Sequence, residues 1–281
     1  SQRLEDNAGI AVESIAVNGD EVVITGQQTT YPSDAEGMSR AARVLDNSLG
    51  EGSYDWYTLV HKPYGMALNQ TSVNAQTLRE YERFETDRRA LRYGMENAVP
   101  SVRQGGEVYN GELDRANAGL ALGYRQNVGG PDSFILYQFL LRANGQFYFD
   151  RNKWLDGTVG INLLNNYDKF EYDGPSNMPR VRTDLRQYLT SSDVQLNRLQ
   201  YTQTEQINRD WFGMAYAGLL EDMYGGIGAE VLYRPHGVDW AVGVDVNWVK
   251  QRGYRQDFSF RDYSTLTGHV TGYLRTGFHD V

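Results

Sequence analysis

A strict alternation of large apolar residues with small or polar ones, repeated along the C-terminal half of the chain, constrains the fold more than any other feature. It is clearest from Trp240 to Trp248, where every even-numbered residue is large and apolar and every odd-numbered residue is small or polar. Successive side chains of a β-strand point to opposite faces, so this segment predicts a strand with one apolar and one polar face.

Further segments after residue 118 alternate in the same way, and together they predict an antiparallel sheet of about eight strands. The predicted strands lie near residues 119–127, 133–149, 154–165, 197–207, 211–222, 226–234, 239–251 and 262–276. The apolar face is expected to carry Leu120, Leu122 and Tyr124 in the first strand, Phe212, Met214, Tyr216 and Leu220 in the fifth, Ile227, Val231 and Tyr233 in the sixth, and Leu266, Val270 and Leu274 in the last.

Both a soluble β-sandwich and an outer-membrane β-barrel show this alternation, so strand length and aromatic residues must distinguish them. The predicted strands run about 9 to 15 residues, whereas strands of globular sheets usually have about 5 to 6. Trp240 and Trp248 are about 26 Å apart along a strand, or roughly 20 Å along the membrane normal at a tilt near 40°, which is close to the ~25 Å apolar band of such barrels. The prediction is a mainly β chain with a transmembrane barrel, or a segment of one, over residues 119–281, and with Trp240 and Trp248 in the two aromatic girdles.

Composition supports this fold and excludes several others. The chain has 20 Tyr, 10 Phe, 5 Trp and 30 Gly but only 7 Pro, which is typical of many strands joined by tight turns. It contains no run of about 18 apolar residues, so it is not a helical membrane protein. It has no cysteine for disulfides or thiolate metal sites. Its net charge of −9 lacks the basic footprint of a nucleic-acid-binding protein.

Residues 1–84 predict a small α+β domain. Two short β-prone runs, 10–17 and 21–26, are joined at Asn18-Gly19, which is a strong hairpin signal. Helical spacing follows over 34–49 and 74–84, and short strands are expected near 57–60 and 66–68. Residues 85–118 mix charges with Gly and Pro without a sustained period and are expected to be a linker.

The loop lengths predict which connections lie outside the cell. If the linker approaches from the periplasm, the long connections 166–196 and 252–261 lie outside, and the turns 150–153, 208–210 and 235–238 are the short periplasmic ones. An alternative remains, because Asn144-Gly145 is also a turn signal that would split the second strand and reverse every later loop.

Two groups of polar residues are candidate contacts for a polysaccharide. The first comprises Arg180, Arg182, Asp184 and Arg186, because guanidinium groups suit the carboxylates and phosphates of an acidic polysaccharide or lipopolysaccharide. The alternative for this group is an ion-pair network that orders a long loop. The second consists of residues expected on the inner face of the barrel, where they either contact sugar hydroxyls or pair with one another: Arg125, Glu230, Arg234, Asp245, Asn247 and His269.

The sequence predicts no catalytic residue, metal site or cofactor. The four histidines are scattered without metal-ligand spacing. Ser264 and His269 have opposite parity on one strand, so their side chains point to opposite faces and do not form a nucleophile and base.

Several independent stretches between residues 160 and 270 resemble one known family. They include Asn165 to Phe170, Met178 to Tyr188, Gly218 to Gly228, Glu230 to Pro235, Trp240 to Gly243, Lys250 to Arg252, and Thr267 to His269. These segments resemble the YjbH/GfcD family of outer-membrane exopolysaccharide (capsule) biosynthesis proteins. Ser39 to Leu45, on the first predicted long helix, is similar to the periplasmic domain of that family.

The resemblance implies a component of a capsule or exopolysaccharide production system in the Gram-negative outer membrane, with residues 1–118 in the periplasm. Expected partners are an acidic polysaccharide, other exopolysaccharide secretion proteins and outer-membrane lipids. Family members are longer and usually carry a lipoprotein signal, so this chain is expected to be a processed or internal piece. A non-enzymatic conduit, scaffold or docking platform is the leading hypothesis. The alternatives are an outer-membrane enzyme acting on polysaccharide or lipid A, and a soluble periplasmic carbohydrate-binding β-sandwich.

Overall fold

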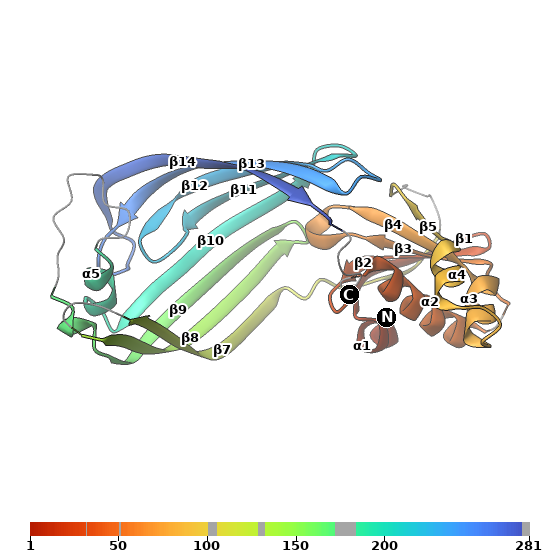
Figure 1. Cartoon of the computed structure of the whole chain (residues 1–281), viewed down its shortest axis with the longest axis horizontal. Coiled ribbons are helices and arrows are strands. Elements are labelled where there is room, and N and C mark those ends of the chain that lie inside the picture. The colour runs from red at the N-terminus through yellow and green to blue at the C-terminus, as the bar shows by residue number, and fades with distance from the viewer. Residues whose placement is uncertain (32, 51, 101–105, 129–132, 172–183, 277–281) are drawn as a thin grey trace.

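The chain forms two β-sheets that follow each other along the long axis of the molecule (Figure 1). The computed structural model describes residues 1–276 apart from 32, 51, 101–105, 129–132 and 172–183. The first sheet carries four helices, and the second is a single curved layer of long strands. Within the described residues, no helix is long and apolar enough to cross a membrane.

The N-terminal sheet has six strands in the order β5-β4-β3-β2-β1-β6. Its strands are β1 (Ile10–Asn18), β2 (Glu21–Gln28), β3 (Trp56–His61), β4 (Asn69–Asn74), β5 (Met95–Ala98) and β6 (Gly106–Asn110). The helices are α1 (Gln2–Ala8), α2 (Asp34–Leu49), α3 (Ala75–Glu82) and α4 (Arg88–Tyr93). The predicted hairpin is confirmed, and Gly19 supplies its turn with a φ of 60°.

A buried core holds the helices of this unit to its sheet. Met38, Ala41 and Ala42 of α2 are fully buried against strand residues such as Ile24 and Tyr57. This burial follows from the helical spacing of apolar residues that the sequence shows. The predicted helices over 34–49 and 74–84 are therefore confirmed as α2 and α3.

A polar triad of the buried Asp46 and Tyr57 with the partly buried Arg79 also links α2 to the sheet and to α3. Asp46 accepts hydrogen bonds from the Tyr57 hydroxyl at 2.7 Å and from Arg79 Nη2 at 2.7 Å. Burial by itself raises the pKa of the Asp46 carboxyl, but the hydrogen bonds from Arg79 and Tyr57 outweigh it and hold that pKa below its usual value. The carboxylate is therefore ionised at neutral pH and stays paired.

The expected linker, 85–118, needs correction, because it contains α4, β5, β6 and the beginning of the second sheet. β5 pairs with β4, and β6 pairs with β1, so both extend the first sheet at its edges. β5 is only four residues long and every residue of β6 is exposed, so neither shows an apolar alternation. The strand expected near 66–68 starts later, at Asn69, and it is buried on both faces, by the polar Gln70, Thr71 and Ser72 and by the apolar Val73.

The second sheet has eight strands, each antiparallel to the next, in the order β14-β13-β12-β11-β10-β9-β8-β7. The strands are β7 (Ala116–Val128), β8 (Ile135–Asp150), β9 (Lys153–Asn165), β10 (Val194–Gln206), β11 (Trp211–Leu219), β12 (Tyr224–Tyr233), β13 (Trp240–Arg252) and β14 (Phe260–Leu274). All eight predicted strands are confirmed. β8 runs straight through Asn144 and Gly145, which pair with Gly119 and Gly157, so this dipeptide is not a turn.

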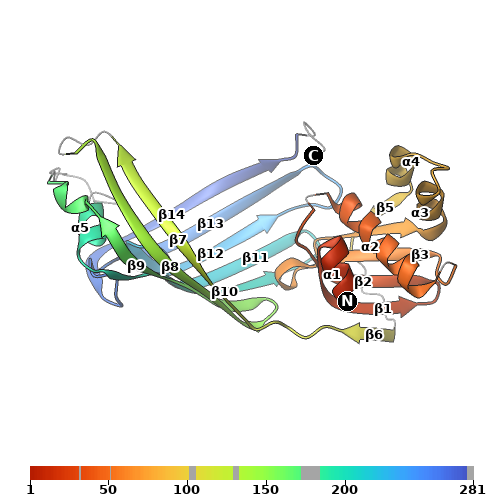
Figure 2. The ribbon, with the colours of Figure 1, turned by 90° about the horizontal axis from the view of Figure 1, so that it is seen from below.

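The sheet curls into an open trough, with β7 and β14 along its two rims (Figures 1 and 2). Among the strands that the structure describes, these two are the edges of the sheet and do not pair with each other, so the trough is not a closed barrel. The predicted barrel is thus supported as a curved eight-stranded antiparallel sheet and not as a closed cylinder.

The two ends of the trough differ. The turns that join β8 to β9, β10 to β11 and β12 to β13 lie beside the first sheet, as predicted for one set of loops. The opposite end carries the 3₁₀ helix η2 (Tyr167–Lys169) and helix α5 (Leu185–Thr190). We call these the near end and the far end of the trough.

Candidate functional site: the inner face of the trough

The outer face of the trough is apolar along β13 and β14. Trp240, Val244 and Trp248 are each 43–49% exposed, and their partners Val270 and Leu266 on β14 are more exposed still. This confirms the predicted facing of both strands. Trp240 and Trp248 begin and end this apolar stretch, and their role in membrane girdles stays a prediction.

The facing predicted for β11 is wrong. Met214 pairs with Glu230 and Tyr216 pairs with Gly228, which places both side chains on the inner, polar face. Phe212 shares that face and is buried, whereas Gly213, Ala215 and Ala217 point outward. Alternation separates a strand's residues into two sets, but it does not say which set faces inward when the inner set contains the larger side chains.

A row of ionisable side chains crosses the inner face of the last three strands. Glu230 on β12 pairs with Asp245 on β13, which pairs with His269 on β14. His269 Nδ1 lies 3.2 Å from Asp245 Oδ1, and Asn247 Nδ2 donates to Asp245 Oδ2 at 2.7 Å. The structure thus brings together four of the predicted inner residues, and their contact with sugar stays a prediction.

Two other predicted inner residues lie at opposite ends of the trough. Arg125, on β7, forms an ion pair of 2.8 Å with Asp222 at the far end. Arg234 follows β12 in the near-end turn, where its backbone N–H donates to Asp210 O at 2.8 Å. Neither belongs to the row formed by Glu230, Asp245 and His269.

A polar groove of about 440 Å³ occupies the inner face at the near end, and the sequence alone did not reveal it. Two aromatic rings contribute to its lining: Trp154 of β9, and Tyr64 from the 3₁₀ turn η1 (Pro63–Gly65) of the first domain, with ring centroids 5.0 Å apart. Its polar lining includes Asn144, Gln146, Asp156, Thr158 and Arg198. Asp156 and Arg198 form an ion pair of 2.8 Å, and Thr158 donates to Asn144 Oδ1 at 3.0 Å.

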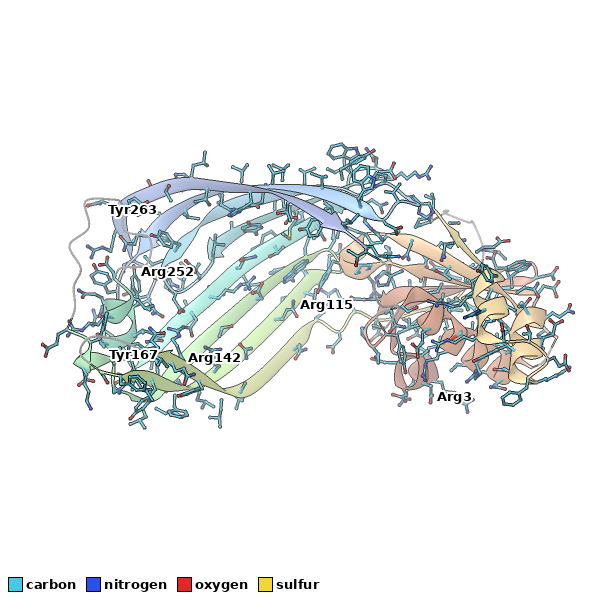
Figure 3. All side chains as sticks on the ribbon, viewed as in Figure 1. Arg3, Arg115, Arg142, Tyr167, Arg252 and Tyr263 are labelled. Carbon is cyan, nitrogen blue, oxygen red and sulfur yellow. The ribbon has the colours of Figure 1, made fainter. Side chains whose placement is uncertain are left out.

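The far end is filled by a buried network around Arg252, the last residue of β13 (Figure 3). Its side chain is fully buried and donates to four backbone carbonyls, those of Leu196, Asn197, Glu221 and Asp257. The Tyr188 hydroxyl donates to the Arg252 carbonyl at 2.6 Å. Burial raises the pKa of Tyr188 to about 12, so the hydroxyl keeps the proton that it donates.

The predicted arginine-rich group is only partly described. Arg180 and Arg182 lie outside the described residues. Asp184 is buried at the far end and accepts hydrogen bonds from Gln251 at 3.2 Å and from Tyr254 at 3.1 Å. This favours a role for Asp184 in ordering the far-end connections.

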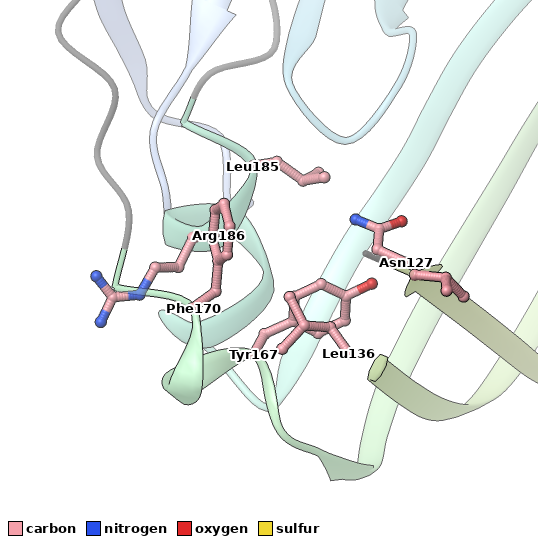
Figure 4. A pocket seen from close by; sticks show the side chains of 7 residues that line it. Asn127, Leu136, Tyr167, Phe170, Leu185 and Arg186 are labelled. Atoms are coloured by element: carbon pink, nitrogen blue, oxygen red, sulfur yellow. The ribbon is translucent and has the colours of Figure 1, made fainter. Parts of the chain in front are cut away.

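Arg186 lines a second cavity, of about 290 Å³, between η2, α5 and the ends of β7 and β8 (Figure 4). Tyr167, Leu136 and Leu185 supply much of its wall. The guanidinium of Arg186 extends away from Tyr167 and Leu136 in the close-up view. The cavity is largely apolar where these side chains meet.

The described residues contain no group of three or more His, Asp or Glu side chains placed to hold a metal ion. Ser264 pairs with Lys250 and His269 pairs with Asp245, so the register places Ser264 and His269 on opposite faces of β14. The prediction that the chain has no catalytic site stays a prediction.

Comparison with known proteins relates the whole chain to one family. A family model described as "Exopolysaccharide biosynthesis protein YbjH" matches residues 1–281. The chain is also 35% identical over 285 residues to a protein of Escherichia coli (strain K12) described as "Uncharacterized lipoprotein YjbH". The match covers 98% of this chain and 40% of the relative, so the chain spans less than half the relative's length. No solved structure matches it. The chain therefore belongs to the YjbH family of exopolysaccharide biosynthesis proteins.

Proposed function

We propose that this chain is the outer-membrane part of an exopolysaccharide or capsule secretion system, in which the trough forms part of a transmembrane β-barrel. The observation that carries the proposal is the two-faced sheet: its outer face exposes Trp240, Val244 and Trp248, and its inner face carries Glu230, Asp245 and Asn247. An apolar outer face and a polar inner one are what a barrel in a bilayer requires. Membership of an exopolysaccharide biosynthesis family supports a polysaccharide as the substance that this barrel would handle.

In this proposal the near end faces the periplasm. The first sheet and its helices lie beside the short turns, and barrels of the outer membrane have short periplasmic turns and longer external connections. Residues 1–118 then lie in the periplasm, where they are available to other secretion proteins. The far end, with α5 and the buried Arg252 network, faces the outside.

The role is that of a non-enzymatic conduit, scaffold or docking platform for an acidic polysaccharide. The soluble β-sandwich is disfavoured, because the eight long strands form one sheet whose apolar face is exposed instead of packed on a second sheet among the described residues. For an enzyme acting on polysaccharide or lipid A, the nucleophile and base that the sequence offered give no support, because Ser264 and His269 lie on opposite faces of β14.

Deletion of the gene from an exopolysaccharide-producing strain tests this proposal. Surface polysaccharide is expected to fall, with polymer retained in the periplasm, because the path through the outer membrane is lost. Staining of surface and periplasmic polysaccharide measures both pools, and re-expression of the full-length protein is expected to restore the surface pool. An unchanged amount of surface polysaccharide would contradict the proposal.

A further inference from the structure

We propose that the near-end groove is a binding subsite for pyranose units of the transported polysaccharide, with Tyr64 and Trp154 as stacking surfaces. This inference rests on the proposed function and adds to it a location and a ligand class. The groove opens on the inner face of the trough, at the end where a polymer would enter from the periplasm. A volume of about 440 Å³ accommodates one or two sugar rings, by comparison with ordinary ligand pockets of roughly 300–1,000 Å³.

The aromatic rings suit the apolar faces of sugars. A pyranose ring presents axial C–H groups on at least one face, and these pack against an aromatic ring much as other apolar groups do. The rings of Tyr64 and Trp154 meet at an interplanar angle of 31°. The ring centroid of Tyr148, on the paired strand β8, lies 6.0 Å from that of Trp154. Tyr64 is 41% exposed and lines the groove, so part of its surface is accessible there.

Residues of the second sheet hold the turn that carries Tyr64 in place. Thr204 Oγ1 donates to the Tyr64 carbonyl at 2.7 Å, and the Ala67 N–H donates to Gln206 Oε1 at 3.0 Å. Gly65 has a φ of 77°, and a Cβ there would lie 2.8 Å from Asn152 Cβ, so only glycine permits this close approach.

Tyr64 itself has a left-handed φ of 50°, which is uncommon for a residue other than glycine. Such a conformation persists where the surrounding contacts enforce it, and these positions are concentrated at ligand-binding sites. The contacts with Asn152, Thr204 and Gln206 thus fix the turn that presents Tyr64.

The polar groups of the groove suit sugar hydroxyls. Asn144 and Gln146 carry amide groups that both donate and accept hydrogen bonds, and Thr158 anchors the Asn144 oxygen. Arg198 has five N–H donors, and its side chain is 44% exposed although it pairs with Asp156. The Asp156–Arg198 pair balances charge, so the groove recognises a hydroxyl-rich chain and tolerates a carboxylate on it.

The test is calorimetric binding of oligosaccharides to the full-length protein in detergent micelles. The probe is a set of short fragments made by partial acid hydrolysis of the exopolysaccharide of the strain that carries the gene. Tyr64→Ala and Trp154→Ala are each expected to weaken binding about tenfold or more, since each removes one stacking surface. Trp154→Phe keeps an aromatic ring and is expected to retain most of the affinity.

Tyr93→Ala is the matched control, because Tyr93 is a tyrosine of the same domain that is 91% exposed and does not line the groove. It is expected to bind like the unchanged protein. If Trp154→Ala does not fold, Tyr64→Ala and Gln146→Ala decide the result. Two results would overturn the subsite. One is that the unchanged protein binds no fragment, and the other is that the folded Tyr64→Ala, Trp154→Ala and Gln146→Ala proteins bind fragments with the affinity of the unchanged protein.

The gene deletion distinguishes failure of the subsite from failure of the proposed function. If deletion lowers surface polysaccharide but the Tyr64→Ala and Trp154→Ala proteins bind fragments normally, the subsite is wrong and the secretion role stands. If deletion changes nothing but both variants lose binding, the subsite stands and the secretion role is wrong.

Discussion

Replacing Arg252 by methionine is expected to destabilise the far end of the trough by about 3–5 kcal/mol, one of the largest single effects available in this chain. The guanidinium donates to four backbone carbonyls that come from β10, the β11–β12 connection and the β13–β14 connection. An unsatisfied buried polar group costs about 1–3 kcal/mol. The net effect is smaller than the sum of four such costs, because burial of the charged group carries its own desolvation cost.

Thermal and urea denaturation of the full-length protein in detergent micelles would measure this loss, and proteolysis of the connection 253–259 would locate it. Arg255→Met is the matched control, since Arg255 is an exposed arginine of the same connection. Arg252→Lys is not expected to restore stability, because a single ammonium group lacks the planar fork that reaches several carbonyls at once. Equal stability of the Arg252→Met and Arg255→Met proteins would contradict the structural role of this network.

A charge on the outer face is expected to have the second large effect. Val244 lies midway between Trp240 and Trp248 and is 45% exposed on the outer face of β13. In the proposed barrel this position is close to the bilayer midplane, where an arginine on the lipid face costs about 2–4 kcal/mol. Val244→Arg is therefore expected to lower the free energy of unfolding in lipid vesicles by about 2–4 kcal/mol, as measured by urea titration.

Thr271→Arg provides the matched control on the inner face. Thr271 pairs with Gly243, one residue from Val244, and its side chain is exposed on the opposite side of the sheet. The inner face already carries charged groups such as Asp245, so a further arginine is expected to be tolerated within about 1 kcal/mol. Equal losses at Val244 and Thr271 would show that the two faces have the same surroundings.

The strands of the trough were predictable because their physical signal is local. A two-residue period over nine or more residues identifies a strand from its own sequence, and Trp240 to Trp248 shows both the strand and its apolar face. The same reasoning failed to choose the face of β11, because Met214 and Tyr216 are large but lie on the polar side. Only pairing with β12 decides that question.

The near-end groove and the Arg252 network were not predictable, because they depend on contacts between distant segments. Tyr64 meets Trp154 only after the first domain docks on the β8–β9 turn, and no periodic pattern in either segment signals that contact. From the sequence alone, Arg252 is one charged residue at the end of a strand, with nothing to indicate that it is buried. Its burial follows from connections that fold back over it.

The edge strands of the first sheet also required the structure. β5 and β6 owe their place to pairing with β4 and β1; only Met95 of β5 is buried, and every residue of β6 is exposed. Strands this short and this exposed produce no recognisable alternation. Sequence reasoning therefore identified the hairpin and the long helices of this domain but not the two edge strands of its sheet.

The central claim is that the outer face of the trough contacts lipid and the inner face does not. The chain has no cysteine, so single cysteines at Val244 and Thr271 can each carry one fluorescent probe without background labelling. Quenching by lipids with a spin label at mid-acyl depth, in vesicles that contain the folded full-length protein, measures contact with the bilayer interior directly. Strong quenching of the probe at Val244→Cys with weak quenching at Thr271→Cys is the predicted result, whereas equal quenching at the two positions, or none at either, would contradict the claim.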